Sequence, residues 1–221
     1  ARGSDLVVRD DRPSTVLPAI ATEYDADTVY CQTLPAPEEQ HVEAAVRSSL
    51  RDQGRSLQTA WTHTLYHPAD LPTPIQNIED TFTPWRQDVE ATIEPRDPRP
   101  TPDEIHSPTL DGGELPTLAA LGFDEEPPER DQRAVYAFEG GESAGLDRLD
   151  EYVWDRDRLR EYKQTRNGLL GADYSSKFSP WLAHWCLSPR QIYAEIERYE
   201  RNRVENDSTY WLVFELAWRD F

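Results

Sequence analysis

The segment at residues 174–183, Tyr-Ser-Ser-Lys-Phe-Ser-Pro-Trp-Leu-Ala, holds the residue types that bind phosphate groups. Ser179 followed by Pro180 is typical of a helix N-cap and its first helical residue, so a helix is predicted to begin there. The free amides and positive dipole of a helix start, with Ser175, Ser176 and Lys177 beside them, suit a phosphate or a diphosphate. A capped helix behind a polar loop is the commoner explanation of such residues, so they indicate anion binding only weakly.

A second group of polar residues interrupts the apolar stretch at residues 211–220. Glu215, Trp218 and Arg219 are spaced i, i+3, i+4 and would share one face of a helix. One interpretation is an ion pair between Glu215 and Arg219 beside a packed tryptophan. The other is the wall of a binding pocket, in which Trp218 stacks on a planar group, Glu215 hydrogen-bonds a base edge and Arg219 meets a phosphate.

The first 94 residues alternate strand and helix patterns, which is typical of βαβ units and a parallel sheet. The strand candidates are too few for a complete doubly wound domain, so we expect a sheet that is cut off at its N-terminal side. The strand candidates are residues 6–8, 28–32 and 56–61; the helix candidates are residues 18–22, residues 38–52 with the stripe Val42, Val46 and Leu50, and a helix with the face Phe82, Trp85, Val89 and Ile93.

Prolines and glycines recur through residues 95–140, which therefore read as a linker with one short apolar piece at 115–123. From Gly141 onward the pattern is helical, with a first stripe at Leu146, Leu149 and Val153 and a last helix at 209–221. Ser188-Pro189-Arg190-Gln191 is a capping box, and the helix it starts carries Ile192, Ile196 and Tyr199 on one face. The sequence thus predicts an α/β part at 1–94, a linker at 95–140 and an all-α part at 141–221.

The charge balance is strongly acidic, with 42 Asp and Glu against 23 Lys and Arg and a net charge of −19. The acidic residues are dispersed through patterned segments, which indicates a solvated surface suited to high salt, as in halophilic proteins. Such a surface repels nucleic acid, so any DNA contact must come from a local basic site.

Several functional classes find no support in the sequence. His63, His67 and Asp70 could be metal ligands, but Pro68 and Pro72 break the helix that would align them. No apolar run is long enough to span a membrane, and no secretion leader is visible. The two cysteines, Cys31 and Cys186, are expected to be reduced thiols in the cytoplasm. Because the chain begins at Ala1 and contains no Met, we expect its natural start to be missing.

Four runs of the C-terminal part together resemble the flavin domain of the cryptochrome/photolyase family, in its DASH-type cryptochrome subgroup. Two upstream runs resemble the same subgroup more loosely, so the resemblance covers most of the chain. It implies the α/β antenna domain of a photolyase, truncated, followed by the first part of the all-α FAD-binding domain. The four runs are Tyr162–Gly168, Tyr174–Ala183, Cys186–Arg190 and Ser208–Phe221, and the two upstream runs are His63–Pro72 and Gly140–Gly145.

The resemblance also implies a role for individual residues. Tyr162 would contact FAD and Arg166 would contact DNA, while Glu215, Trp218 and Arg219 would line the pocket for the DNA lesion. The flavin diphosphate and ribityl chain would lie on Ser175, Ser176, Lys177, Phe178 and Ser179. The family has a flavin-contacting tryptophan three residues before the glutamate, where this chain has Leu212, so Trp211 is assigned to the flavin in its place. A folate antenna, 5,10-methenyltetrahydrofolate, would lie near Glu79 or Asp80.

The implied activity is light-driven repair by a monomeric deoxyribodipyrimidine photolyase. Reduced FAD would pass one electron to a flipped cyclobutane pyrimidine dimer, in single-stranded DNA where flipping costs least. Glu215 would hydrogen-bond the pyrimidine and Trp218 would stack on it. The chain lacks the opening strands, the adenine side of the FAD site and the electron-transfer tryptophans of the family. We therefore expect the complete protein to be active and the isolated chain to be inactive.

Two alternatives remain open. The complete protein could be a blue-light photoreceptor whose output is signalling, or an acidic interaction protein that keeps an inactive flavin fold. The second alternative leaves the serine segment and the Glu-x-x-Trp-Arg helix together unexplained.

Overall fold

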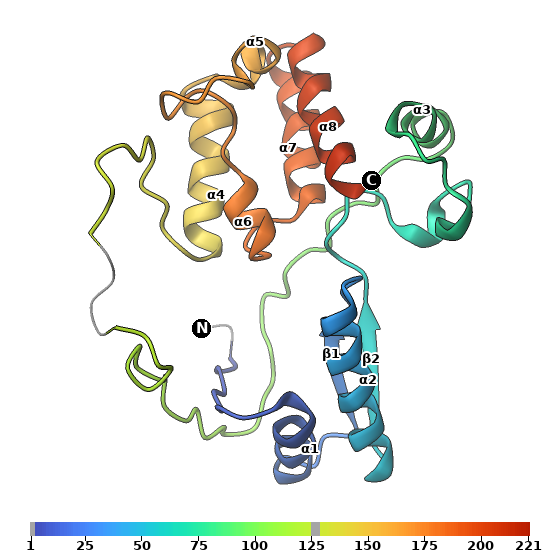
Figure 1. Ribbon diagram of the computed structural model, residues 1–221, viewed down its shortest axis with the longest axis vertical. Helices are drawn as coiled ribbons and strands as arrows, with labels where there is room; N and C mark the ends of the chain where they lie inside the picture. The colour runs from blue at the N-terminus through green and yellow to red at the C-terminus, as the bar shows by residue number, and fades with distance from the viewer. Residues whose placement is uncertain (1–2, 125–128) are drawn as a thin grey trace. The chain divides into compact units, whose positions relative to one another are not determined.

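Two short parallel strands form the only sheet among the described residues, 3–124 and 129–221, of the computed structural model (Figure 1). β1 (Thr28–Gln32) pairs with β2 (Ser56–Ala60) in a register that runs from Thr28 opposite Ser56 to Gln32 opposite Ala60. The helix α2 (Pro37–Asp52) connects them, which makes the βαβ unit that the alternating pattern predicted. Gly54, with a φ of +73°, supplies the left-handed turn between α2 and β2.

A small apolar core holds this βαβ unit together. Val46 and Leu50 of α2 are buried with Leu57 of β2 and with Ala21 of α1 (Pro13–Glu23). Val42, the first member of the predicted α2 stripe, is exposed. α1 is also longer than the predicted helix, because Pro13 stands at its first turn, where a missing N–H costs nothing.

The predicted strand at residues 6–8 is wrong. Leu6 is exposed, and the amide of Val8 donates to the carbonyl of Gly112 at 2.8 Å in an isolated contact and not in a ladder. A short apolar run needs a neighbouring strand to become one, and none lies beside it in the described part of the chain.

Helices make up the C-terminal half, as its 3.6-residue pattern predicted (Figure 1). Leu149 and Val153 are buried as expected, whereas Leu146 of the same stripe is exposed. The buried face runs instead through Gly145, Arg148, Leu149, Tyr152 and Val153, from α4 into a wider π-type turn, η3, and Leu146 lies beside it. The helical elements are α4 (Glu142–Asp150), η3 (Glu151–Asp155), η4 (Leu159–Glu161), α5 (Tyr162–Thr165), α6 (Ser179–Ala183), α7 (Pro189–Asn202) and α8 (Asp207–Asp220).

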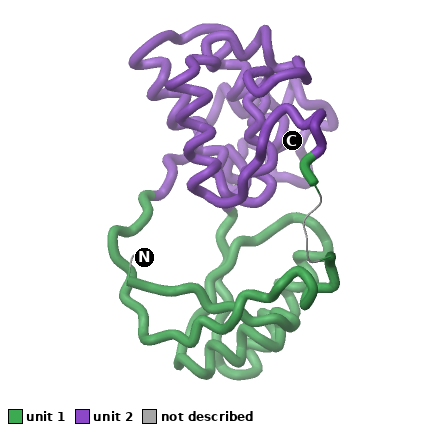
Figure 2. The backbone as a smooth tube through the Cα atoms, turned by 90° about the vertical axis from the view of Figure 1, so that its left-hand side faces the viewer, with its two compact units in different colours: residues 1–61, 100–130 green, residues 62–99, 131–221 purple. Residues whose placement is uncertain are grey.

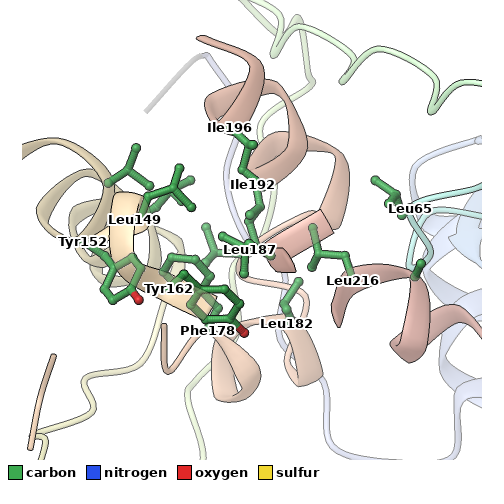
Figure 3. Packing of buried hydrophobic residues seen from close by; sticks show 14 of the residues in the cluster. Leu65, Leu149, Tyr152, Tyr162, Phe178, Leu182, Leu187, Ile192, Ile196 and Leu216 are labelled. Atoms are coloured by element: carbon green, nitrogen blue, oxygen red, sulfur yellow. The ribbon is translucent and has the colours of Figure 1, made fainter. Parts of the chain in front are cut away.

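The starts of α7 and α8 are fixed by side-chain caps. The Ser188 hydroxyl accepts from the amide of Arg190 while the Gln191 side chain accepts from the amide of Ser188, which confirms the predicted capping box. Asn206 caps α8 through the amides of Ser208 and Thr209. Ile192, Ile196 and Tyr199 of α7 are fully buried, together with Leu212 and Leu216 of α8. This core also contains the residues labelled in Figure 3.

The chain divides into two compact units, each built from two separate stretches (Figure 2). Unit 1 contains residues 1–61 and 100–130, and unit 2 contains residues 62–99 and 131–221. This division differs from a boundary at residue 94, because α3 (Phe82–Thr92) packs its buried face, Phe82 and Trp85, against aromatic residues of α8.

The stretch at 62–99 also contains two single turns, η1 (Pro68–Asp70) and η2 (Ile75–Asn77). Residues 95–140 contain no helix or strand in their described part, and 125–128 of that predicted linker lie outside the described residues. The apolar piece at 115–123 forms only turns, with Leu115 and Phe123 exposed. Within the described ranges, no helix has the length and apolar content that crossing a bilayer requires.

Candidate functional site

Three of the predicted site residues come together at the junction of α5 and α8. The Arg166 guanidinium follows α5 and forms an ion pair with the carboxylate of Glu215 on α8. The same guanidinium lies 4.2 Å from the centroid of the Trp211 ring, one helical turn before Glu215. All three side chains are partly exposed, so a cation, a carboxylate and an indole lie together at the surface.

Lys163 brings a second cation to the same place. Its ammonium group lies 5.8 Å from the Trp211 ring and 2.8 Å from the carboxylate of Asp207. The amide of Lys163 donates to the hydroxyl of Ser208 at 3.1 Å, which ties the start of α5 to the first turn of α8. This hydrogen bond fixes the distance between residues 162–166 and the face of α8 that carries Trp211 and Glu215.

Trp218 has one ring face covered and remains half exposed. Its ring stacks on Phe82 with a centroid distance of 3.9 Å and an interplanar angle of 18°. Phe221 adds an edge contact at 6.0 Å, and 47% of Trp218 stays accessible. Since Phe82 is itself buried beside Trp85, the stacked pair is a rigid aromatic platform.

Arg219 is not paired with Glu215, contrary to the ion-pair interpretation of the sequence. Its guanidinium donates to the backbone carbonyl of His63 and, at 3.5 Å, to that of Leu182 at α6. Glu215 finds a different arginine, Arg166, because the rotation of α8 that buries Leu212 and Leu216 directs it to the α5 side.

The next residue, Asp220, continues this attachment of α8 to the segment at 63–66. Its two carboxylate oxygens accept from the amides of Leu65 at 3.0 Å and Tyr66 at 2.8 Å. Burial raises the pKa of Asp220 to about 7, although the two amides and Arg219 act in the opposite direction. Arg219 and Asp220 therefore fix the C-terminal turn of α8, which carries Trp218.

The serine segment forms a loop and a very short helix. α6 begins at Ser179 as predicted, but it ends at Ala183, and the Ser179 hydroxyl caps nothing because Phe178 stands at the N-cap position. The predicted role of Ser179 as a cap is therefore wrong. Phe178 already has helical backbone angles, so the chain turns one residue earlier than a serine cap would allow.

The backbone before α6 has an unusual conformation that suits an anion. Ser175 and Lys177 have positive φ values of 56° and 59°, which non-glycine residues seldom adopt. The amides of Ser176 and Lys177 donate to no other residue in the described part of the chain. Successive amides in alternating backbone conformations form a concavity for anions, so this loop fits a diphosphate.

The Lys177 ammonium lies close to this concavity. It donates to the carbonyl of Tyr174 at 2.6 Å and to the Ser175 hydroxyl at 3.4 Å. Burial and the nearby Arg148 lower the pKa of Lys177. Both effects disfavour the bare cation, and a bound anion would compensate for them.

Tyr162 and Phe178, two further residues assigned to the flavin, belong to the core of unit 2. Both are buried, as Figure 3 shows for the Tyr162 and Phe178 labels among Leu149, Leu182 and Leu187. Burial raises the pKa of the Tyr162 phenol. Their assigned roles stay predictions, since the core explains both side chains.

Arg148 of α4 is a residue that the sequence pattern did not identify. It is 1% exposed, and its guanidinium donates to the carbonyls of Ser176 at 3.2 Å and Ala172 at 2.8 Å. It also pairs with Glu151 at 2.8 Å. The sequence could have identified Arg148 because it stands beside Leu149 on the buried side of a predicted helix. A charge at such a position is costly without partners.

The two carboxylates predicted to lie near an antenna are exposed at the start of α3. Glu79 lines a cavity of about 350 Å³ with Pro72, Asn77, Trp85 and Asp88, whereas Asp80 is not among its lining residues. The cavity is within unit 2. The antenna role of either residue stays a prediction.

Comparison with known proteins gives consistent relatives along the whole chain. A family model described as DNA photolyase matches residues 1–103. Cryptochrome DASH of Natronomonas pharaonis is 60% identical over 223 residues, which cover 100% of this chain and 46% of that protein. Cryptochrome DASH of Gloeobacter violaceus is 47% identical over 99% of this chain and 44% of its own length. The chain thus spans a little under half the length of these relatives.

Solved structures share the fold. A Synechocystis cryptochrome superposes with a TM-score of 0.93 and 46% identity, over 100% of this chain and 45% of that one. A class III photolyase of Agrobacterium tumefaciens superposes with a TM-score of 0.77 at 23% identity, over 94% of this chain and 42% of its own. These likenesses confirm the predicted fold class, a partial doubly wound sheet followed by a partial all-α domain.

Proposed function

Because the chain belongs to the cryptochrome/photolyase family, we propose that the complete protein uses FAD and blue light to repair cyclobutane pyrimidine dimers in single-stranded DNA. The observation that carries the proposal is the meeting of Arg166, Trp211 and Glu215 on one exposed face, one helical turn from the half-exposed Trp218. A flipped dimer needs a flat stacking surface, a partner for its polar edge and a cation for its phosphate. Trp218, Glu215 and Arg166 have these three properties.

The loop at 174–179 supports FAD as the cofactor. Its two free amides and Lys177 would hold the diphosphate, with Ser175, Ser176 and Ser179 as further hydrogen-bond partners. When bound, the photoexcited reduced flavin would supply one electron to the dimer and take it back after the ring opens. The role of the protein is to hold both partners in place.

Each pocket residue has a defined task in this proposal. Trp218 stacks on one pyrimidine with its free face, since Phe82 covers the other face. Glu215 hydrogen-bonds the base edge and steadies the charge that develops on the dimer. Arg166 holds Glu215 in position and faces the phosphate beside the lesion.

Single-stranded DNA fits the charge of the chain better than duplex DNA does. With a net charge of −19, the chain has little general attraction for a duplex, whose charge density is higher. A dimer in a single strand also has no partner bases, so the cost of turning it out is lowest. Local contacts at Arg166 and Lys163 then suffice.

The test is a repair assay on single-stranded DNA with one thymine dimer, performed with the complete protein and its Glu215→Gln variant. The variant keeps the size of the side chain but loses its charge, so we expect repair to fall about tenfold or more, as for loss of a charged hydrogen bond. Glu205→Gln, at an exposed carboxylate away from the site, is the control and should repair normally.

The outcomes separate the proposed function from its alternatives. Bound FAD without any repair would favour a photoreceptor, and a complete protein without a flavin chromophore would favour an interaction protein. Repair that is insensitive to Glu215→Gln would count against the assignment of Glu215, while leaving the activity itself in place.

A further inference from the structure

Arg148 is the most completely buried charged side chain among the described residues, and each of its three nitrogens donates to an acceptor. Its Nε donates to the Ser176 carbonyl at 3.2 Å and its Nη2 to the Ala172 carbonyl at 2.8 Å. Its Nη1 pairs with Glu151 at 2.8 Å. The guanidinium thus joins α4 to two points of the loop that precedes α6.

Aromatic rings enclose the rest of this guanidinium. Its central carbon lies 4.8 Å from the Tyr136 ring centroid and 5.1 Å from the Tyr152 ring centroid. A planar cation with several donors fits this arrangement, whereas a lysine ammonium would reach fewer of the acceptors. For stability alone, an apolar residue of similar volume would fill such a site at least as well. The arginine therefore calls for another explanation.

The loop that Arg148 holds has a backbone that does not form by itself. Ser175 and Lys177, on either side of the contacted Ser176, both have positive φ values. Such conformations persist only where surrounding contacts impose them. The bonds to Ala172 and Ser176 are contacts of this kind, because they fix one carbonyl before Ser175 and one between the two unusual residues.

We propose that Arg148 is a positioning residue for the flavin diphosphate: it holds residues 172–178 in the conformation that presents the amides of Ser176 and Lys177 to the anion. The inference rests on the proposed function, because it takes FAD as the ligand of this loop. Arg148 itself is covered by the loop and by Tyr136 and Tyr152, so it acts through the backbone and not by touching the phosphates.

The first test measures FAD binding by equilibrium titration of the flavin-free complete protein. Arg148→Lys keeps the charge but not the geometry, and we expect the dissociation constant for FAD to rise about tenfold or more. Glu151→Gln is the matched control, since it removes the ion pairs of Glu151 with Arg148 and Arg156 and leaves both carbonyl bonds of Arg148. We expect its affinity for FAD to stay within about threefold of the wild type.

A second test separates positioning from general stabilisation of the fold. In the Arg148→Lys background, Ser175→Gly and Ser175→Ala both lose the hydroxyl, but only glycine adopts a positive φ without strain. In this background the glycine variant should bind FAD more tightly than the alanine variant. The ratio of their two dissociation constants should be larger than the ratio between Ser175→Gly and Ser175→Ala measured with Arg148 present. A residue that only stabilises the core would leave the two ratios equal.

Each result decides the inference. Three results would overturn it. The first is a ratio of glycine-variant to alanine-variant affinity that is the same with and without Arg148. The second is an unchanged FAD affinity of Arg148→Lys, and the third is a loss of affinity in Glu151→Gln as large as that in Arg148→Lys. If Arg148→Lys does not fold, Arg148→Gln, which keeps a planar hydrogen-bond donor, replaces it in both tests, and an unchanged FAD affinity would again contradict the positioning role. A wild-type protein that binds no FAD would overturn both the proposed function and this inference, whereas the other results affect the Arg148 role alone.

Discussion

Arg166 and Glu215 form an ion pair between side chains that are 49 residues apart in the sequence. The pair joins the end of α5 to the middle of α8, and the Trp211 ring lies under its cation at 4.2 Å. Both charges are partly exposed, so the pair alone adds little stability. Its value is geometric, because it fixes where a carboxylate and a cation stand relative to each other on one face.

Replacing Arg166 should weaken DNA binding in a salt-dependent manner. If its guanidinium contacts a phosphate, Arg166→Ala in the complete protein should reduce the slope of log affinity against log salt by about one, whereas Arg166→Lys should keep the slope. The measurement is a salt series of binding to single-stranded DNA that carries a dimer. Arg198→Ala, at an arginine paired with Glu195 on α7, is the control. An unaltered slope in Arg166→Ala would contradict the phosphate contact.

The Phe82–Trp218 stack should be sensitive to the size of Phe82. Phe82 is buried, so Phe82→Ala should lower the free energy of unfolding by about 3–5 kcal/mol, while Phe82→Leu should cost about 1.5 kcal/mol or less. Both changes remove the ring that holds Trp218, so both should weaken binding of the dimer. Denaturant unfolding and DNA titration measure the two effects. Ile75→Ala, at an exposed apolar residue, should change neither the free energy of unfolding nor dimer binding. Normal dimer binding by Phe82→Leu would show that Trp218 needs no support from a ring at position 82.

Asp220 should make the stability of the protein depend on pH near neutrality. Its pKa of about 7 lies above the value near 3.9 of an unfolded aspartate, so the folded state holds the proton more tightly. The contribution of Asp220 to the free energy of unfolding is therefore greatest below pH 4, and this contribution is lost as the pH rises to about 7. The groups that face Asp220 are the amides of Leu65 and Tyr66, the Arg219 guanidinium and, further away, the phenol of Tyr66.

The check is a comparison of Asp220→Asn with Asp150→Asn, an exposed carboxylate of α4. Between pH 5 and pH 8 the wild type should lose up to a few kcal/mol relative to Asp220→Asn, since each pKa unit is worth about 1.4 kcal/mol. Relative to Asp150→Asn no such change should occur. If the free energies of unfolding of the wild type and Asp220→Asn changed with pH in the same way, Asp220 would be ionised in the folded state throughout this pH range.

Gly145 should not tolerate a side chain. A Cβ at this position of α4 would lie 3.0 Å from both the Trp181 ring and Leu187. Helix propensity favours alanine over glycine by about 1 kcal/mol, so a net destabilisation of about 1–2 kcal/mol by Gly145→Ala would measure the overpacking. Gly140→Ala, where a Cβ meets nothing within 4 Å, should be neutral. A Gly145→Ala variant more stable than the wild type would mean that Trp181 moves away at no cost.

Local patterns predicted those parts of the fold that are determined locally. The capping box at Ser188 and the apolar face of α7 depend on neighbouring residues, and β1 and β2 find their partner across a single connecting helix; each is present. Residues 6–8 could not be decided in this way, since a strand depends on a partner elsewhere in the chain. The predicted N-cap at Ser179 was wrong because the chain already turns at Phe178, which has helical backbone angles.

The candidate site was predictable as a set of residues but not as a set of contacts. Spacing placed Glu215, Trp218 and Arg219 on one helix, and one of its two interpretations paired Glu215 with Arg219, while the structure pairs Glu215 with Arg166. Phe82 and Arg148 have partners that are far away in sequence, which periodicity within one helix does not report. The residues that support a site are harder to find than those that form it.

The interleaved path of the chain determines how relatives can exchange segments by recombination. Unit 2 draws on residues 62–99 and 131–221, so the chain leaves and re-enters the same unit. A crossover after residue 94 would give Phe82 and Trp218 different parents and would separate Asp70 from Arg96, which are joined by hydrogen bonds of 2.6 and 2.7 Å. Chimaeric genes should inherit 62–99 and 131–221 as one block, and shuffled libraries built in this way should retain far more folded members.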